Sequence, residues 1–185
     1  ECTEQPEPLR RLAEDCRDQG LRVAIHTNGA FPEHVPRLIG EVDKVSLDIK
    51  AAWPHYYEVT DLNCARHVQA SLARYREAHA AGTLPEFEVV HTVFRGHEAE
   101  VPAVAAVAEG VDLVLQQGVW GREPPLSLAE FQALADQLHR PVRIRTKEIG
   151  EVLYQDGVFT VAGSMTVTDP ERLQAYYKSG VPDGD

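Results

Sequence analysis

Residues 21–50, LRVAIHTNGAFPEHVPRLIGEVDKVSLDIK, contain the pattern that decides the fold. Two short apolar runs, 21–25 and 42–49, are typical of buried strands. Between them, residues 31–39 have the pattern of a short helix with Pro32 in its first turn. A strand, a helix and a second strand in this order predict parallel strands joined by a helical connection.

The same alternation continues on both sides of this stretch. It predicts helices over 6–19, 65–81, 98–109 and 127–139, and strands over 87–94, 111–115 and 142–145. Ser127 and Glu130 have the spacing of a helix capping box. We therefore expect an α/β fold with parallel strands and helices outside.

After Gly150 the pattern changes. Two short apolar runs, 152–154 and 158–161, flank Asp156-Gly157, a pair that favours a tight β-hairpin turn. This interpretation divides the chain into an α/β part over 1–149 and a small β appendage with a tail over 150–185. We expect the last residues, 181–185, to be disordered.

Composition excludes some classes of function. The chain has 185 residues, 43% of them hydrophobic, and a net charge of −11, which predicts a folded domain without general affinity for nucleic acids or anionic membranes. No apolar run reaches the roughly 20 residues that a bilayer span needs, and no signal peptide pattern opens the sequence. We expect a cytoplasmic protein.

Polar residues gather where the predicted strands end. They are His26, Thr27 and Asn28 after the first strand, Asp48 and Lys50 after the second, His91 and Thr92 on the third, and Gln116 and Gln117 on the fourth. The carboxyl ends of parallel strands in a barrel meet at one mouth, so this pattern favours a binding site there. The alternative is that each polar group ends its strand in solvent.

Asp48 and Lys50 are two residues apart, so they should face the same side of their strand. If buried, they would need each other or a ligand. His26, His91 and Asp48 together are a minor alternative, a metal site of the hydrolase type. Cys2, Cys16 and Cys64 are too widely spaced for a disulfide framework or a CxxC metal site.

Three segments have the order and spacing of motifs in radical S-adenosylmethionine activating enzymes. They are Glu1-Cys2-Thr3-Glu4-Gln5-Pro6, His26-Thr27-Asn28-Gly29 and Leu47-Asp48-Ile49-Lys50, where that superfamily has GGEPTLQP, DTNG and MDIK. Tyr57–Thr60 and Val114–Gln117 further resemble the branch that activates anaerobic ribonucleoside-triphosphate reductases. The resemblance runs from Glu1 to about Gly121 and more faintly to Gly150.

The resemblance implies a partial (βα) barrel, of which residues 1–149 are the C-terminal part. It also implies two cofactors, S-adenosylmethionine and a [4Fe–4S] cluster, with a monovalent cation as a third bound group. The CxxxCxxC motif that holds the cluster is missing from this sequence. We therefore expect an N-terminally truncated fragment, inactive alone, whose cluster cysteines lie upstream.

Six cofactor-binding residues follow from matching the motifs one position at a time: Glu1, Thr27, Asn28, Asp48, Lys50 and Gln117. Glu1 would lie near the amino group of the methionyl part. Thr27 and Asp48 would lie near its carboxylate and a cation, and Lys50 would contact the cofactor. Gln117 would bind ribose or carboxylate.

The sequence also departs from the motifs. His26 stands where the family has Asp, Cys2 where it has Pro, and Val90 aligns with an Arg. The loss of the Asp puts the cation site and one contact to the amino group in doubt.

The resemblance implies an enzyme that cleaves S-adenosylmethionine reductively to a 5′-deoxyadenosyl radical. Its partners would be an electron donor and a glycyl-radical enzyme such as anaerobic ribonucleotide reductase. Two alternatives stay open, another radical S-adenosylmethionine enzyme similar to deazaguanine synthases, and a degenerate barrel without a cluster that acts as a binding module. His26 and Val90 slightly favour the module, whereas the retained residues favour the enzyme; these are Glu1, Thr27, Asp48 and Lys50.

Overall fold

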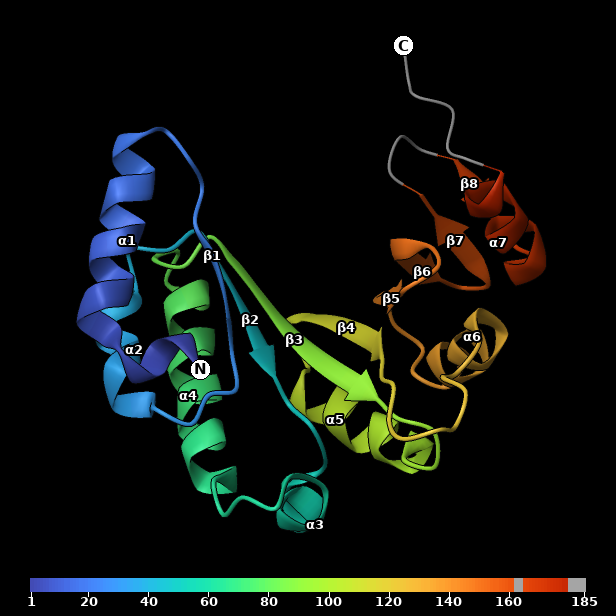
Figure 1. The fold of residues 1–185 in the computed structure, drawn as a ribbon, viewed down its shortest axis with the longest axis horizontal. Coiled ribbons are helices and arrows are strands. Elements are labelled where there is room, and N and C mark those ends of the chain that lie inside the picture. Colours follow the sequence, from blue (N-terminus) through green and yellow to red (C-terminus); the bar gives the residue numbers. More distant parts are fainter. Residues whose placement is uncertain (162–164, 180–185) are drawn as a thin grey trace. The chain divides into compact units, whose positions relative to one another are not determined.

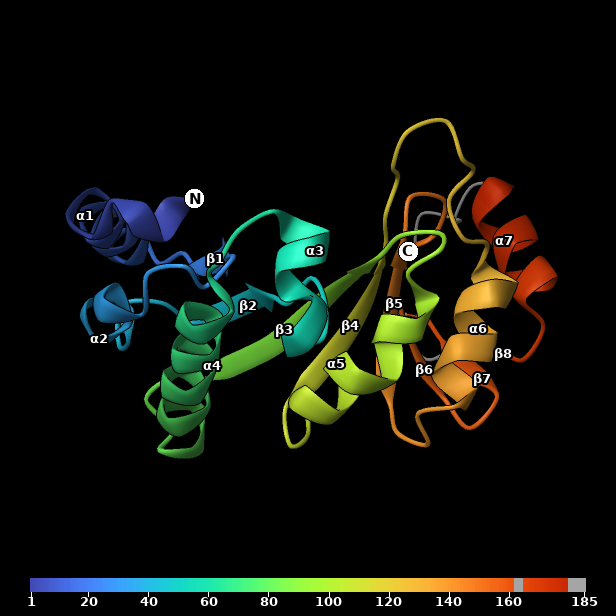
Figure 2. The same ribbon diagram turned by 90° about the horizontal axis from the view of Figure 1, so that it is seen from below.

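The computed structural model describes residues 1–161 and 165–179, and Figures 1 and 2 show it in two views at right angles. The chain forms two compact units, Glu1–Val90 and His91–Asp185, called unit one and unit two below. Their boundary falls inside strand β3 (Glu86–Val93). The predicted boundary at residue 150 stays a prediction.

Unit one alternates helices and strands. In chain order it contains η1 (Cys2–Glu4), α1 (Pro6–Asp18), β1 (Ala24–Thr27), η2 (Pro32–His34), α2 (Val35–Leu38), β2 (Lys44–Asp48), η3 (Trp53–His55), α3 (Tyr56–Thr60), α4 (Ala65–Ala80) and most of β3. Strand β2 pairs in parallel with both β1 and β3, with Thr27 opposite Leu47 and Asp48 opposite Val90. The predicted parallel strands with helical connections are confirmed in this unit.

The apolar core of unit one lies between its strands and α4. Leu47, Phe87 and Val89 are buried on the strands, and the Tyr75 ring of α4 packs on Phe87 with 5.7 Å between ring centroids. Figures 1 and 2 show α4 running beside the strands of this unit. Because strand side chains alternate, this packing leaves Lys44, Ser46 and Asp48 on the opposite face.

Unit two contains the remaining elements. They are η4 (Glu98–Glu100), α5 (Val101–Val107), β4 (Asp112–Gln117), α6 (Leu128–Asp136), β5 (Val142–Thr146), β6 (Gly150–Gln155), β7 (Val158–Thr160), β8 (Thr166–Val167) and α7 (Pro170–Lys178). Strands β4 and β5 are parallel, whereas β5 to β8 pair antiparallel in chain order. Helices α6 and α7 lie side by side (Figures 1 and 2).

The predicted capping box is present at the start of α6. The Ser127 hydroxyl accepts a hydrogen bond from the Glu130 amide, and the Glu130 carboxylate accepts one from the Ser127 amide at 2.7 Å. The predicted hairpin is also present, with Asp156 and Gly157 both at positive φ between β6 and β7. Tyr154 and Phe159, paired across this hairpin, are buried with 4.8 Å between ring centroids.

Some elements differ from the expectation. Strand β1 begins at Ala24 rather than Leu21, whose side chain is exposed. The helix expected over 98–109 is a 3-10 turn followed by the shorter α5. Helices α3 and α7 and strand β8 were not predicted. The tail 181–185 lies outside the described residues.

Within the described ranges, no helix combines the length and the apolar character needed to cross a membrane.

Candidate functional site

The carboxylate of Glu1 closes the carboxyl end of β1. Its Oε1 accepts hydrogen bonds from the Thr3 amide at 3.0 Å, the Thr3 hydroxyl at 2.6 Å and the Thr27 hydroxyl at 2.7 Å, and its Oε2 accepts one from the Asn28 amide at 2.8 Å. Four donors occupy most of the lone pairs that a carboxylate offers. Two segments far apart in sequence are thereby held together.

The environment of Glu1 keeps it ionised. Desolvation of the carboxylate raises its pKa, but hydrogen bonds from Asn28, Thr3 and Thr27 outweigh that effect and leave the pKa below its ordinary value. The charged form is therefore the one that this network stabilises.

The turn after β1 is fixed from both sides. The Asn28 side-chain oxygen accepts from the Ala30 amide at 3.0 Å, and Gly29 has φ +72. A Cβ on Gly29 would lie 2.7 Å from Leu47 Cδ1. The Gly29 carbonyl accepts a hydrogen bond from the Ser71 hydroxyl of α4 at 2.8 Å. Only glycine fits this position, because it needs both positive φ and close packing.

Cys2 and His26 lie next to this turn. The Cys2 thiol donates to the backbone carbonyl of His26 at 3.1 Å. Desolvation, and then the charge of Glu1, raise the pKa of Cys2, which favours the neutral thiol. The Cys2 side chain thus acts as a small hydrogen-bond donor in this environment.

Asp48 and Lys50 form an ion pair at the end of β2. Lys50 Nζ lies 3.2 Å from Asp48 Oδ2, and the two side chains are 31% and 30% exposed. The prediction that they share one side is confirmed. Because the pair is only half-buried, a ligand from solvent can reach both charges.

Sequence reasoning missed a buried ionic cluster on β2 and β3. Glu88 is fully buried, accepts from the Ser46 hydroxyl at 2.6 Å and forms an ion pair with Lys44 at 2.7 Å. The available signal was a glutamate inside the predicted strand 87–94. A charge in such a strand indicates a polar partner on the neighbouring strand.

Gln117 lies in unit two and holds two loops together. Its side-chain amide donates to the Leu126 carbonyl at 2.8 Å and accepts from the Lys147 amide at 3.1 Å. This bonding is a structural use of Gln117. Its predicted contact with ribose or carboxylate stays a prediction.

The metal site considered as a minor alternative, made of His26, His91 and Asp48, is not formed. Across residues 1–161 and 165–179, no three or more His, Cys, Asp or Glu side chains gather in a way that could hold a metal ion. Strand alternation gives the physical reason, because His91 shares a face of β3 with Phe87 and Val89 rather than with Glu88. His26, His91 and Asp48 therefore do not act as one ligand set.

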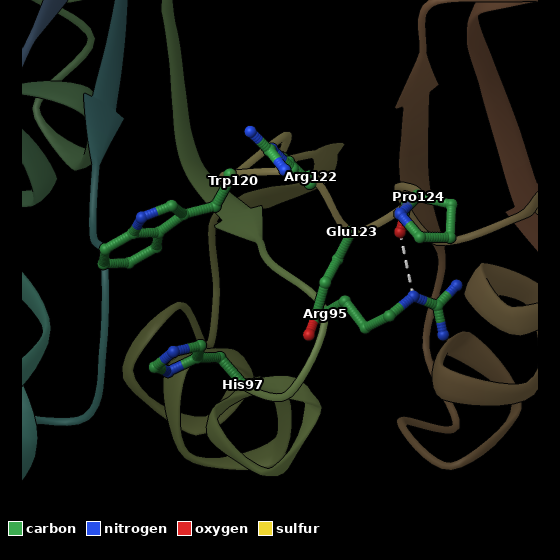
Figure 3. A pocket seen from close by; sticks show the side chains of 8 residues that line it. Arg95, His97, Trp120, Arg122, Glu123 and Pro124 are labelled. Carbon is green, nitrogen blue, oxygen red and sulfur yellow. Dashed lines mark hydrogen bonds between the residues drawn. The ribbon is translucent and has the colours of Figure 1, made fainter.

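A pocket of about 380 Å³ opens in unit two, between the loops that follow β3 and β4 (Figure 3). It is called the Trp120 pocket below, and it is lined by Arg95, His97, Gly118, Trp120, Gly121, Arg122, Glu123 and Pro124. The sequence analysis did not single out this pocket. Its signal was an aromatic residue between two glycines in a loop after a buried strand.

The sequence matches no protein-family profile and no curated protein. Several solved structures are similar, including the following two. One is a domain of pyruvate-formate lyase-activating enzyme from Bacteroides vulgatus, with TM-score 0.58 and 16% identity over 75% of this chain and 88% of that one. The other is TYW1 with a lysine-pyruvate adduct bound, with TM-score 0.60 and 15% identity over 80% of this chain and 51% of that one.

These likenesses concern the fold. They confirm the expected α/β class of the partial-barrel type, with parallel strands and helices outside. Identities of 15% and 16% carry no residue roles from those proteins to this chain.

The residues present fit the two implied cofactors unequally. A half-buried ion pair at the carboxyl end of a strand can exchange partners with a zwitterion, so Asp48 and Lys50 fit the amino and carboxylate groups of S-adenosylmethionine. An iron–sulfur cluster needs several thiolates side by side, whereas Cys2, Cys16 and Cys64 are separate free cysteines. The described residues therefore do not fit a cluster.

Proposed function

We propose that this chain belongs to a radical S-adenosylmethionine enzyme that installs a glycyl radical on a partner protein such as anaerobic ribonucleotide reductase. One observation supports the proposal most strongly. Glu1, Thr27 and Asn28, which come from two separate motifs of the resemblance, are joined directly by hydrogen bonds. The fold that the chain shares with a domain of a pyruvate-formate lyase-activating enzyme supports the same class of function.

In this proposal Lys50 and Asp48 bind the methionyl part of the cofactor. The Lys50 ammonium is the partner for its carboxylate, and the Asp48 carboxylate is the partner for its amino group. Lys50 and Asp48 neutralise each other in the free protein. When the zwitterionic methionyl part binds, their single ion pair is replaced by two, one from Lys50 to the carboxylate and one from Asp48 to the amino group, and these four groups together carry no net charge.

In this proposal Glu1 positions the turn after β1. Its Oε1 accepts three hydrogen bonds, from Thr3 and Thr27, whereas its Oε2 accepts one, from the Asn28 amide. Glu1 fixes the turn after β1, and that turn leads into the elements that position Asp48. This role differs from the one that the motif match implies.

In enzymes of this class the cluster supplies one electron that cleaves S-adenosylmethionine and produces the 5′-deoxyadenosyl radical. The part of the chain that the structure describes does not provide the cluster ligands. Its own residues bind and orient the methionyl groups at the strand ends.

One observation favours the binding module as a second candidate. The polar groups of unit one largely satisfy one another, with Glu1 bound by Thr3, Thr27 and Asn28, and Glu88 by Lys44 and Ser46. Such a network is stable without a cofactor. A module of this kind would keep the fold and bind a ligand without cleaving it.

The test measures 5′-deoxyadenosine released by the protein made from the complete reading frame, after anaerobic reconstitution with iron and sulfide and addition of a reductant. We expect release from the parent and at least a tenfold loss in Lys50→Gln. Lys178→Gln, which changes a lysine at the end of α7, is the matched control and should keep parent activity. If clusters form but no 5′-deoxyadenosine appears, the proposal is wrong and the binding module is favoured.

A further inference from the structure

The Trp120 pocket has one aromatic wall. The Trp120 indole and the His97 imidazole are stacked with an interplanar angle of 5° and 6.0 Å between ring centroids. The Phe94 ring supports Trp120 edge-on at 5.4 Å. Trp120 is nevertheless 60% exposed, and its neighbour Val119 is 65% exposed. An indole that is held in place and yet left open is a ready surface for another flat ring.

The opposite wall is polar and held in place. Figure 3 shows the Arg95 side chain directed away from the two rings and toward the Pro124 carbonyl, to which it donates at 2.9 Å. The same guanidinium binds both oxygens of Glu130 at 2.8 and 3.0 Å and donates to the Pro125 carbonyl. Arg95 therefore has a structural role, and the Glu130 carboxylate neutralises its charge.

Arg122 supplies the positive charge that Arg95 does not. It is exposed, and no ion pair of Arg122 occurs among the contacts of the described residues. In the view of Figure 3, Arg122 and His97 lie on opposite sides of Trp120. The Glu123 carboxylate also lines the pocket. Its negative charge repels anions, so the pocket favours a ligand with only a small negative charge.

Glycines keep the pocket open. A Cβ on Gly118 would lie 2.5 Å from the Phe94 ring and 2.9 Å from the Val93 carbonyl, so this position has room only for glycine. Gly121 has φ +64, which lets the chain turn sharply after Trp120. Together they bring the backbone close to the indole without side chains that would cover it.

We propose that the Trp120 pocket binds a planar aromatic ring that carries a single anionic group. The ring stacks on Trp120, and Arg122 donates charge-assisted hydrogen bonds to the anion. A nucleoside monophosphate and an aromatic carboxylate share this chemistry. The inference goes beyond the proposed function, because S-adenosylmethionine carries a positive sulfonium and no anion on its ring system.

The chain offers a direct reporter for this site. It has two tryptophans, Trp53 and Trp120, so Trp53→Phe leaves Trp120 as the sole indole. Adenosine 5′-monophosphate, adenosine, inorganic phosphate and nicotinate are titrated against this variant while indole fluorescence is recorded. We expect saturable quenching by the monophosphate, by nicotinate or by both, at least tenfold stronger than by adenosine or phosphate. Whichever ligand quenches the indole shows whether the bound ring belongs to a nucleotide or to an aromatic carboxylate.

Two arginine variants of the reporter test the anion contact. Arg122→Gln should weaken binding of the anionic ligand about tenfold and leave adenosine unchanged. Arg172→Gln, at an exposed arginine of α7, is the matched control and should change neither. Saturation-transfer NMR on the unsubstituted chain repeats the measurement without the Trp53 change.

Three outcomes would overturn the inference. They are the absence of saturable binding in both measurements, equal affinity for adenosine and its monophosphate, and displacement of the monophosphate by S-adenosylmethionine. The last would assign the pocket to the cofactor. The titration needs neither a cluster nor cleavage, so its failure and that of the proposed function are distinguishable.

Discussion

Two regions differ in how fully their polar groups are paired: the networks around Glu1 and Glu88 in unit one, and the Trp120 pocket in unit two. In unit one, Glu1 and Glu88 are bound by neighbouring hydroxyls, amides and an ammonium. In unit two, the aromatic and charged side chains of Trp120 and Arg122 are exposed in a pocket. Polar groups that are fully hydrogen-bonded within the protein stabilise the fold. Exposed groups without such partners remain able to bind a ligand.

The contrast gives an expectation about substitutions. Changes in the networks of unit one should lower the free energy of unfolding, because each leaves a polar partner unsatisfied. Changes on the wall of the Trp120 pocket should alter binding and leave stability nearly unchanged.

The largest decrease in the free energy of unfolding should come from Lys44→Met. This change leaves the Glu88 carboxylate buried without its ammonium partner, which typically costs about 3 to 5 kcal/mol. Urea unfolding followed by circular dichroism measures it.

A double variant is the control for this prediction. Lys44→Met with Glu88→Leu removes both charges and should recover most of the loss, since an apolar pair can replace a buried ion pair. If the single variant unfolds at the parent's midpoint, the cluster does not stabilise unit one.

A smaller loss should follow from Gly29→Ala. The new Cβ meets Leu47 at 2.7 Å and also forces alanine into positive φ, which together cost about 2 to 3 kcal/mol. Gly40→Ala is the matched control, because Gly40 has φ +89 but nothing within 4 Å of the added Cβ. The Gly40→Ala variant should lose only about 1 kcal/mol of unfolding free energy. Equal losses of unfolding free energy in the two variants would show that the close packing of Gly29 against Leu47 contributes nothing.

These positions show where sequence reasoning stops. Apart from α3, the strands and longer helices of unit one were predicted because their periodicity is local, and the capping box at Ser127 was predicted because its signal lies within four residues. The bond between Ser46 and Glu88 joins residues 42 positions apart, and it depends on the register of β2 against β3. A single sequence does not specify that register.

Gly29 and α7 illustrate two kinds of omission. The motif around Gly29 was recognised, but its close approach to Leu47 and Ser71 depends on where α4 packs. By contrast, α7 has a readable start, with Asp169 as the N-cap and Pro170 in the first turn. It was missed because the weaker apolar pattern after Gly150 was interpreted as an appendage and tail.

The pocket residues were missed for a third reason. Trp120 and Arg122 lie in a loop, where no periodicity indicates which side chains face each other. The stacking of His97 on Trp120 brings two separate loops together, and only the tertiary structure shows it. Gln117, a predicted site residue of unit two, likewise holds two loops together through contacts that only the tertiary structure shows.

Glu1→Gln should cost about 1 to 2 kcal/mol at neutral pH, because an amide nitrogen cannot accept the bonds that a carboxylate oxygen accepts. The pKa of Glu1 is lowered in the folded chain, so its contribution is present above the ordinary value of 4.5 and is lost as the pH falls through the folded value. The difference between the parent and Glu1→Gln should therefore shrink on acidification.

Urea unfolding at a series of pH values measures this change, with the exposed Glu4→Gln as the control. A stability difference that stays constant below pH 4.5 would contradict the network assigned to Glu1.

The smallest effect on stability is expected in the Trp120 pocket. Arg122→Gln removes no ion pair seen among the described residues, so the free energy of unfolding should change by less than about 0.5 kcal/mol. Arg95→Gln is the informative contrast in the same pocket, because it breaks the bonds to Glu130, Pro124 and Pro125. It should lower the free energy of unfolding by about 1 to 3 kcal/mol. If Arg122→Gln were as destabilising as Arg95→Gln, Arg122 would be a structural residue like Arg95, and the contrast between the saturated networks around Glu1 and Glu88 and the open Trp120 pocket would fail.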